Sequence, residues 1–180
     1  MRYILVILMV LGFSHASARP ITNVEKAALE ASINDFTEAL AENDMMRVFR
    51  IAPDRVLQSL AAQANMPLDA FLNLVKEQLD QVMTRAEFRH FEFEMERVDL
   101  TDAIHSDGTV IAYGIIPSTF EMVVDGAVFR QETQFLVLSE NGVWYIIRFA
   151  EVQQILLLQQ AYPFFDDLET ARSSVTRLSE

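Results

Sequence analysis

The chain has 180 residues, a formal net charge of −12 and no cysteine. This length suits one domain with a sizeable core. Nucleic-acid binding depends on Lys and Arg that neutralise phosphates, so the acidic balance argues against a nucleic-acid partner and against an anionic membrane surface. The lack of cysteine excludes a disulfide framework and a thiol-linked lipid anchor.

The first residues have the three parts of a secretory signal peptide. Arg2 supplies the positive end, an apolar run follows at residues 3–13, and residues 16–18 have the small-x-small pattern of a cleavage site. The alternative is an uncleaved anchor, but the run is too short to span a bilayer. We expect cleavage after Ala18, a periplasmic or secreted mature chain, and no stable membrane anchor after cleavage.

Helical signals follow as far as residue 84. Thr22 and Glu25 fit a capping box, and the apolar stripe behind it consists of Leu29, Ile33, Phe36 and Leu40. Pro53 and Pro67 each end one helical segment and open the next. The last helix, expected at residues 68–84, has an apolar face made of Leu68, Leu72, Val75, Leu79 and Val82.

The apolar period changes from 3.6 to 2 after residue 88. Apolar residues alternate with glutamates at residues 91–96, which predicts a strand with one buried face. Residues 99–108 are polar and predict a loop. Two β-hairpins follow, with two-residue turns at Asp125–Gly126 and Asn141–Gly142, and these turns fix the register of both hairpins.

That register makes specific pairs. It places Glu121 opposite Arg130 in the first hairpin and Phe135 opposite Arg148 in the second. Pro117 predicts a bulge or an edge, because it cannot donate to a ladder. Near the second turn the strands are apolar on both faces, so the face that the N-terminal helices leave open needs a cover.

The C-terminal tail has the composition of such a cover. We expect it to act as a lid over the open sheet face or as a docking strip for a partner. The residues predicted for this role are Leu156, Tyr162, Phe164 and Phe165. From about Ala171 the chain is polar, which predicts a frayed end.

Helices followed by a curved antiparallel meander, ending in Asn-Gly-Val-Trp-Tyr-Ile at residues 141–146, resemble the NTF2-like (cystatin-like) α+β superfamily. The resemblance implies helices packed on a bent sheet of about four strands around an internal pocket, with a helical or extended tail. We therefore expect a signal peptide at 1–18, one domain at 19–165 and a polar tail at 166–180. The same fold also allows a homodimer formed sheet to sheet.

The predicted pocket carries one cation among apolar groups. Strand alternation places Arg148 near Trp144, Thr133 and Gln131, with Tyr113 as a further wall. Arg148 is interpreted either as an anchor for an anionic ligand or as a side chain at the sheet end that reaches water. The expected partners are a small apolar or anionic ligand, or an envelope protein.

No catalytic constellation is recognisable. His90 falls on the glutamate side of its strand, and His105 lies in a polar loop with Asp102, so neither is placed as a general base. Two separate histidines without a thiol make a metal site a poor interpretation. We expect no cofactor and a non-catalytic binding or assembly module. The alternative is an isomerase or hydrolase that uses an acid/base residue in the pocket.

Overall fold

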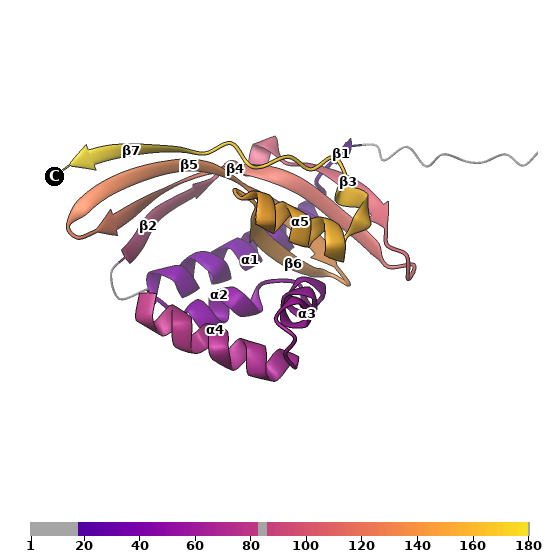
Figure 1. Ribbon diagram of the computed structural model, residues 1–180. Coiled ribbons are helices and arrows are strands. Elements are labelled where there is room, and N and C mark those ends of the chain that lie inside the picture. Colours follow the sequence, from indigo (N-terminus) through magenta and orange to yellow (C-terminus); the bar gives the residue numbers. More distant parts are fainter. Residues whose placement is uncertain (1–17, 83–85, 180) are drawn as a thin grey trace, which may run out of the picture.

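The computed structural model describes residues 18–82 and 86–179, and all structural statements below concern those residues. They form an α+β fold in which N-terminal helices pack on an open antiparallel sheet of seven strands, followed by a C-terminal helix (Figure 1). The predicted signal peptide lies outside the described residues, except for Ala18. No helix of the described chain combines the length and apolar character needed to cross a bilayer.

The bounds of the helical elements are α1 (Asn23–Ala41), α2 (Met45–Arg50), α3 (Asp54–Gln63), α4 (Leu68–Val82), η2 (Met95–Arg97), α5 (Val152–Ala161) and η3 (Pro163–Phe165). The strands are β1 (Ala18–Pro20), β2 (Ala86–Phe93), β3 (Asp99–Ile104), β4 (Val110–Val124), β5 (Ala127–Glu140), β6 (Val143–Arg148) and β7 (Ser174–Ser179).

The long β4–β5 hairpin is the centre of the sheet (Figure 1). Asp125 and Gly126 both have positive φ, at 50° and 82°, as a type I′ turn requires. Pairing then runs without interruption along the hairpin, and it includes the predicted pair of Glu121 and Arg130. The predicted register is confirmed for both hairpins.

Pro117 makes no bulge in this hairpin, because it pairs with Gln134 in the unbroken register. The position of Pro117 fits the other predicted alternative, an unpaired edge, better. On the other side of β4, the pairing with β3 covers residues 110–113 and the pairing with β2 covers residues 118–124. Pro117 lies between these two ladders, where its missing N–H costs no strand hydrogen bond.

Each edge of the hairpin is shared by two strands. β4 pairs with β3 near one end and with β2 near the other, and β5 pairs in the same way with β6 and β7. β1 extends the sheet beyond β3. The sheet therefore has seven strands rather than the expected four or so, because β1, β3 and β7 are short strands that show little apolar alternation.

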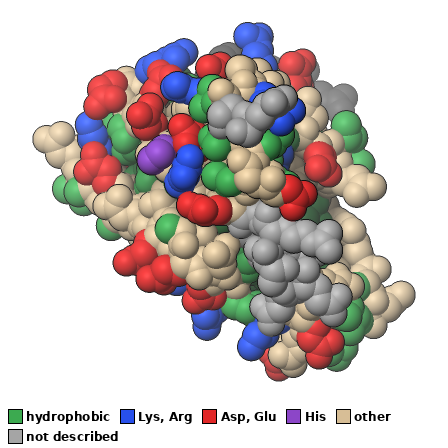
Figure 2. All heavy atoms as spheres, turned by 90° about the vertical axis from the view of Figure 1, so that its left-hand side faces the viewer, with side chains coloured by type: hydrophobic (Ala, Val, Ile, Leu, Met, Phe, Trp, Pro, Cys, Tyr) green, Lys and Arg blue, Asp and Glu red, His purple; other side chains and the backbone are tan. Residues whose placement is uncertain are grey.

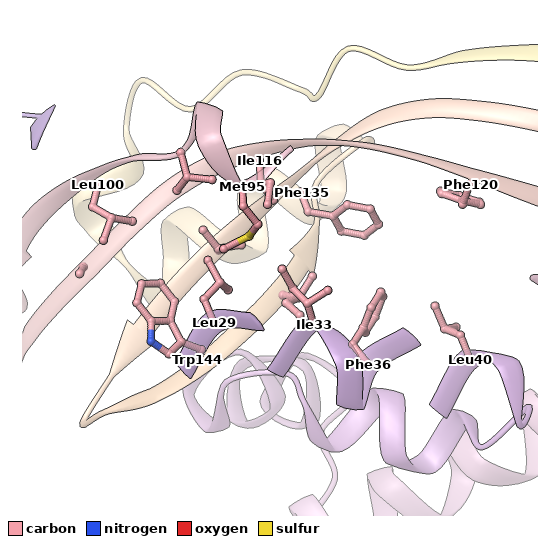
Figure 3. Packing of buried hydrophobic residues seen from close by; sticks show 14 residues of the cluster. Leu29, Ile33, Phe36, Leu40, Met95, Leu100, Ile116, Phe120, Phe135 and Trp144 are labelled. Atoms are coloured by element: carbon pink, nitrogen blue, oxygen red, sulfur yellow. The ribbon is translucent and has the colours of Figure 1, made fainter. Parts of the chain in front are cut away.

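Side chains of β5 and β6 alternate between two hydrophobic cores. Phe135 and Trp144 belong to the first core, which packs on α1, whereas Leu136 and Ile147 lie in or against the second. Figure 3 shows Leu29, Ile33, Phe36 and Leu40 projecting from α1 toward the sheet residues of the first core. The predicted stripe of α1 and its capping box are thus confirmed.

Arg19 fastens the start of the described chain to α1 and β3. Its guanidinium donates to both carboxylate oxygens of Glu25, at 2.9 and 2.7 Å, and to both of Asp102, at 2.7 and 2.9 Å. The hydrogen bonds from Arg19 are the main reason why the pKa of Glu25 falls from 4.5 to about 2. Arg19 therefore binds the Glu25 carboxylate, which also takes part in the capping box of α1.

The α4 helix is less buried than its pattern predicts. Leu68, Leu72 and Val75 are only half-buried, because α4 packs mainly on α2 and α3 and not on the sheet. The side chains of Leu79 and Val82 lie outside those described.

The C-terminal tail folds back on the sheet and completes the second core. Ile155 and Leu158 of α5, followed by Tyr162 and Phe165, are buried there. The Phe165 ring meets Tyr113 edge-on at 4.8 Å. The second core is therefore closed by residues of the chain itself.

Candidate functional site

The predicted pocket residues lie on two different faces of the sheet. Trp144 is 5% exposed and belongs to the first core. Tyr113 belongs to the second core, where its ring stacks on Phe164 at 5.5 Å. These two rings therefore do not wall the same pocket. Arg148 ends β6 opposite Phe135 and is exposed to solvent.

Thr133 and Gln131 do share the face of the first core, and both are buried, at 4% and 7% exposure. The register places Ser118 directly opposite Thr133, and Ser118 is 3% exposed. Neither the Ser118 nor the Thr133 hydroxyl has a hydrogen-bond partner among the described residues. Two adjacent buried hydroxyls thus stand unsatisfied on the helix-facing side of the sheet.

Aromatic rings surround this hydroxyl pair. Phe91 stacks on Phe120 with a centroid distance of 5.2 Å, Phe88 lies 6.0 Å from Phe120, and Phe93 lies 5.6 Å from Phe135. The rings contributed by β2 are only half-buried, so they retain accessible apolar surface. We call this set the aromatic face: Phe36, Phe88, Phe91, Phe93, Phe120 and Phe135, with Ser118, Thr133 and Gln131.

An irregularity in β2 brings its three phenylalanines to one side. The register shifts between Arg89 and Glu92, and His90 has a positive φ of 55°. Phe88 and Phe91 would point to opposite faces in a regular strand, but the shift places both against Phe120. His90 itself is exposed, and its Nδ1 lies 2.9 Å from Glu121 Oε2.

A buried polar network lies at the opposite end of the hairpin. Tyr162 Oη donates to Glu140 Oε2 at 2.9 Å, and Arg55 Nε donates to Glu140 Oε1 at 2.6 Å. Arg55 also donates to Asp107, whose carboxylate lies 3.2 Å from His105 Nδ1. The network ties α3, β5 and the end of α5 together across the second core.

Burial shifts the pKa of Tyr162, whereas hydrogen bonds shift the pKa of Asp107. Burial, followed by the hydrogen bond to Glu140, raises the pKa of Tyr162 well above 10, so the phenol stays a donor. The Thr109 N–H and then Arg55 hold the pKa of Asp107 far below its ordinary value. Both carboxylates of the network thus accept hydrogen bonds from fixed donors, which suits a structural clamp better than proton transfer.

A charged groove of about 630 Å³ is lined by residues of β4 and β5 from both faces of the sheet, Ser118 and Thr133 as well as Thr119 and Glu132. Its basic side chains are Arg97, Arg130 and Arg172. Its acidic ones are Glu92, Glu94 and Glu132, and we call it the outer groove. Figure 2, which faces the β2 and β7 end of the molecule, shows acidic and basic side chains interspersed over the described surface.

The predicted tail residues take different positions. Tyr162 and Phe165 are buried and Phe164 is half-buried, so all three belong to the second core. Leu156 is 59% exposed and borders a groove of about 480 Å³ between α3 and α5. The aromatic residues therefore cover the sheet, while Leu156 faces solvent.

Comparisons with models of protein families, with curated proteins and with solved structures found no significant match. Within the described residues, no group of three His, Cys, Asp or Glu side chains is placed to hold a metal ion. The assignment of a site therefore rests on geometry alone.

Sequence reasoning found part of the aromatic face. It identified Thr133 and Gln131, and the hairpin register that was already fixed places Ser118 beside Thr133. No local signal reveals the shift at His90 that adds Phe88. The Arg55–Glu140–Tyr162 network joins residues far apart in the chain, and nothing in their neighbouring sequence points to it.

Proposed function

We propose that this chain is an exported, non-catalytic binding module whose aromatic face takes a small apolar molecule that carries one polar group. The observation that carries the proposal is the unpartnered hydroxyl pair of Ser118 and Thr133, both more than nine-tenths buried. A buried hydroxyl without a partner costs about 1–3 kcal/mol. A ligand group that hydrogen-bonds to both would recover that loss.

The surroundings of the pair support an apolar ligand body. The half-buried rings of Phe88, Phe91 and Phe93 offer accessible apolar surface on the same face. Small-molecule sites are commonly lined by aromatic and apolar side chains with a few polar groups that fix orientation. Gln131 adds an amide beside Thr133 on this face, and its Nε2 donates to Ser173 Oγ at 3.2 Å.

The arrangement favours binding over catalysis. The polar groups that β4 and β5 place on the aromatic face are the hydroxyls of Ser118 and Thr133 and the amide of Gln131, none of which titrates near neutral pH. The buried carboxylate of Glu140 lies in the other core and already accepts from Arg55 and Tyr162. An isomerase or hydrolase would need an acid or base within reach of the ligand.

Two further parts of the proposal come from the sequence. The signal-like segment before Arg19 supports export to the periplasm, and the order of helices and curved meander supports an NTF2-like arrangement. In that arrangement the aromatic face lines the concave side of the sheet. Arg148, exposed at the end of β6 on this side, is placed to meet a negatively charged head group at the margin.

Thermal unfolding in the presence of 1-decanol and of decanoate tests the proposal. We expect 1-decanol to raise the Tm of the wild-type chain and to have no effect on an S118A/T133V variant. Thr119→Val is the matched control, because Thr119 follows Ser118 on β4 and strand alternation therefore turns its side chain to the opposite face of the sheet. An equal Tm shift in S118A/T133V and in wild type would show that the hydroxyls do not recognise the ligand.

The same measurement examines Arg148. If Arg148 meets an anionic head group, Arg148→Ala lowers the Tm shift caused by decanoate and leaves that caused by 1-decanol unchanged. The exposed position of Arg148 predicts that the substitution itself changes stability by less than about 0.5 kcal/mol. Loss of the fold in Arg148→Ala would instead assign this residue a structural role.

A further inference from the structure

The last strand, β7, is joined to β5 by strand pairing and by a hydrogen bond from Ser174 Oγ to Glu132 Oε2 at 3.4 Å. It pairs with residues 128–132 of β5, but every side chain from Arg172 to Leu178 is exposed. Its two large apolar side chains, Val175 and Leu178, are 59% and 49% exposed. Releasing β7 therefore uncovers little apolar core.

The connection before β7 is long enough to redirect it. Residues 166–173 form no helix or strand between η3 and β7, and Figure 1 shows this connection running over the sheet. Ala171 is the buried residue of this connection, and its N–H donates to the Phe149 carbonyl at 3.1 Å, so this contact must break for the whole connection to open. An extended chain gains about 3.3–3.6 Å per residue, so the connection reaches a neighbouring molecule if it opens.

The edge of β5 is specific for the β7 segment. Gln131 Nε2 donates to Ser173 Oγ at 3.2 Å, and the Arg172 N–H donates to Gln134 Oε1 at 3.3 Å. An edge without β7 would expose a row of unpaired N–H and C=O groups, which is a template for another strand. The strand whose contacts this edge fits is β7, from the same copy or from a second one.

We propose that β7 exchanges between two copies of this chain, so that β7 of each copy pairs with β5 of the other. Both arrangements make the same strand contacts, so their balance is set by protein concentration and by the strain of the connection. Arg172, Ser173 and Ser174 also line the outer groove, so in the exchanged dimer a second copy completes that groove. The inference does not depend on the proposed ligand.

The absence of natural cysteine makes a direct test possible. Glu132 and Ser174 are register partners across β5 and β7. The variants Glu132→Cys and Ser174→Cys are purified separately, mixed at about 1 mM, near the effective concentration within one chain, and then oxidised. Matched control mixtures combine Glu132→Cys with Ser106→Cys, whose cysteine lies in an exposed loop away from β7.

We expect a covalent heterodimer of Glu132→Cys with Ser174→Cys at several times the level formed in the Ser106→Cys mixture. Equal levels in the two mixtures would refute exchange. The double variant E132C/S174C, oxidised when dilute, checks the register and is expected to give a monomer with an internal disulfide. Failure to form that disulfide would overturn the pairing on which the inference rests.

Discussion

Thr133→Val is expected to stabilise the protein in the absence of ligand. Valine replaces the hydroxyl with a methyl group of similar size, so the packing against Phe135 and its neighbours is kept. The Thr133 hydroxyl is buried at 4% exposure and has no partner among the described residues. Removing an unsatisfied buried polar group removes its desolvation cost, whereas most core substitutions destabilise.

The size of the effect follows from that cost. A buried donor or acceptor left unpaired costs about 1–3 kcal/mol, and valine also suits a strand, so a gain of about 1 kcal/mol is expected. For a domain of this size, that gain corresponds to a rise in Tm of roughly 2–4 °C. The free energy of unfolding is measured by urea titration and the Tm by circular dichroism.

Thr22→Val is the contrasting substitution, because the Thr22 hydroxyl, unlike that of Thr133, makes hydrogen bonds. It accepts from the Glu25 N–H at 3.3 Å and donates to the Glu25 carboxylate at 2.7 Å. Loss of this N-cap is expected to destabilise by about 0.5–2 kcal/mol. If Thr133→Val destabilises as much as Thr22→Val does, the Thr133 hydroxyl has a structural partner and the reasoning for the site fails.

Three further substitutions test the framework. Trp144→Ala is expected to cost about 3–5 kcal/mol, because the ring is 5% exposed in the first core; an unchanged urea midpoint would assign the ring to a ligand instead. Tyr162→Phe is expected to cost about 1–3 kcal/mol by leaving the Glu140 carboxylate one donor short, and an unchanged unfolding free energy would remove the phenol from the network. The pKa of Glu25 is lowered from 4.5 to about 2, so the stabilisation that ionised Glu25 contributes is present above pH 4.5 and is lost as the pH falls toward 2. Arg19→Ala should flatten this part of the plot of unfolding free energy against pH. An identical acid profile in the variant would contradict the ion pair between Arg19 and Glu25.

The features that sequence predicts well here are local or are fixed by a local turn. Two-residue turns with positive φ at both positions set the pairing of each hairpin, so one turn determines partners ten residues away. Alternation then assigns Phe135 and Leu136 to different cores. Thr133 and Gln131 were identified in this way.

The features that sequence misses depend on contacts between distant segments. β3 and β7 are short strands whose exposed residues hide the period of a strand. Leu100 is the one residue of β3 that is fully buried, and residues 172–178 are all exposed. The aromatic face depends on the register shift at His90, which turns Phe88 to the same side as Phe91. The alternation of glutamates in the sequence does not reveal this backbone irregularity. Arg148 was predicted from alternation alone, which gives the face of a residue but not its distance from the sheet end.

The most direct test of the binding proposal is native mass spectrometry of the chain purified at its natural level, with organic extraction of whatever is bound. The account predicts a small apolar molecule with one polar group on the wild-type chain and on Thr119→Val, and none on S118A/T133V. An empty wild-type chain, or a ligand retained equally by S118A/T133V, would contradict the assignment of the aromatic face as the binding site.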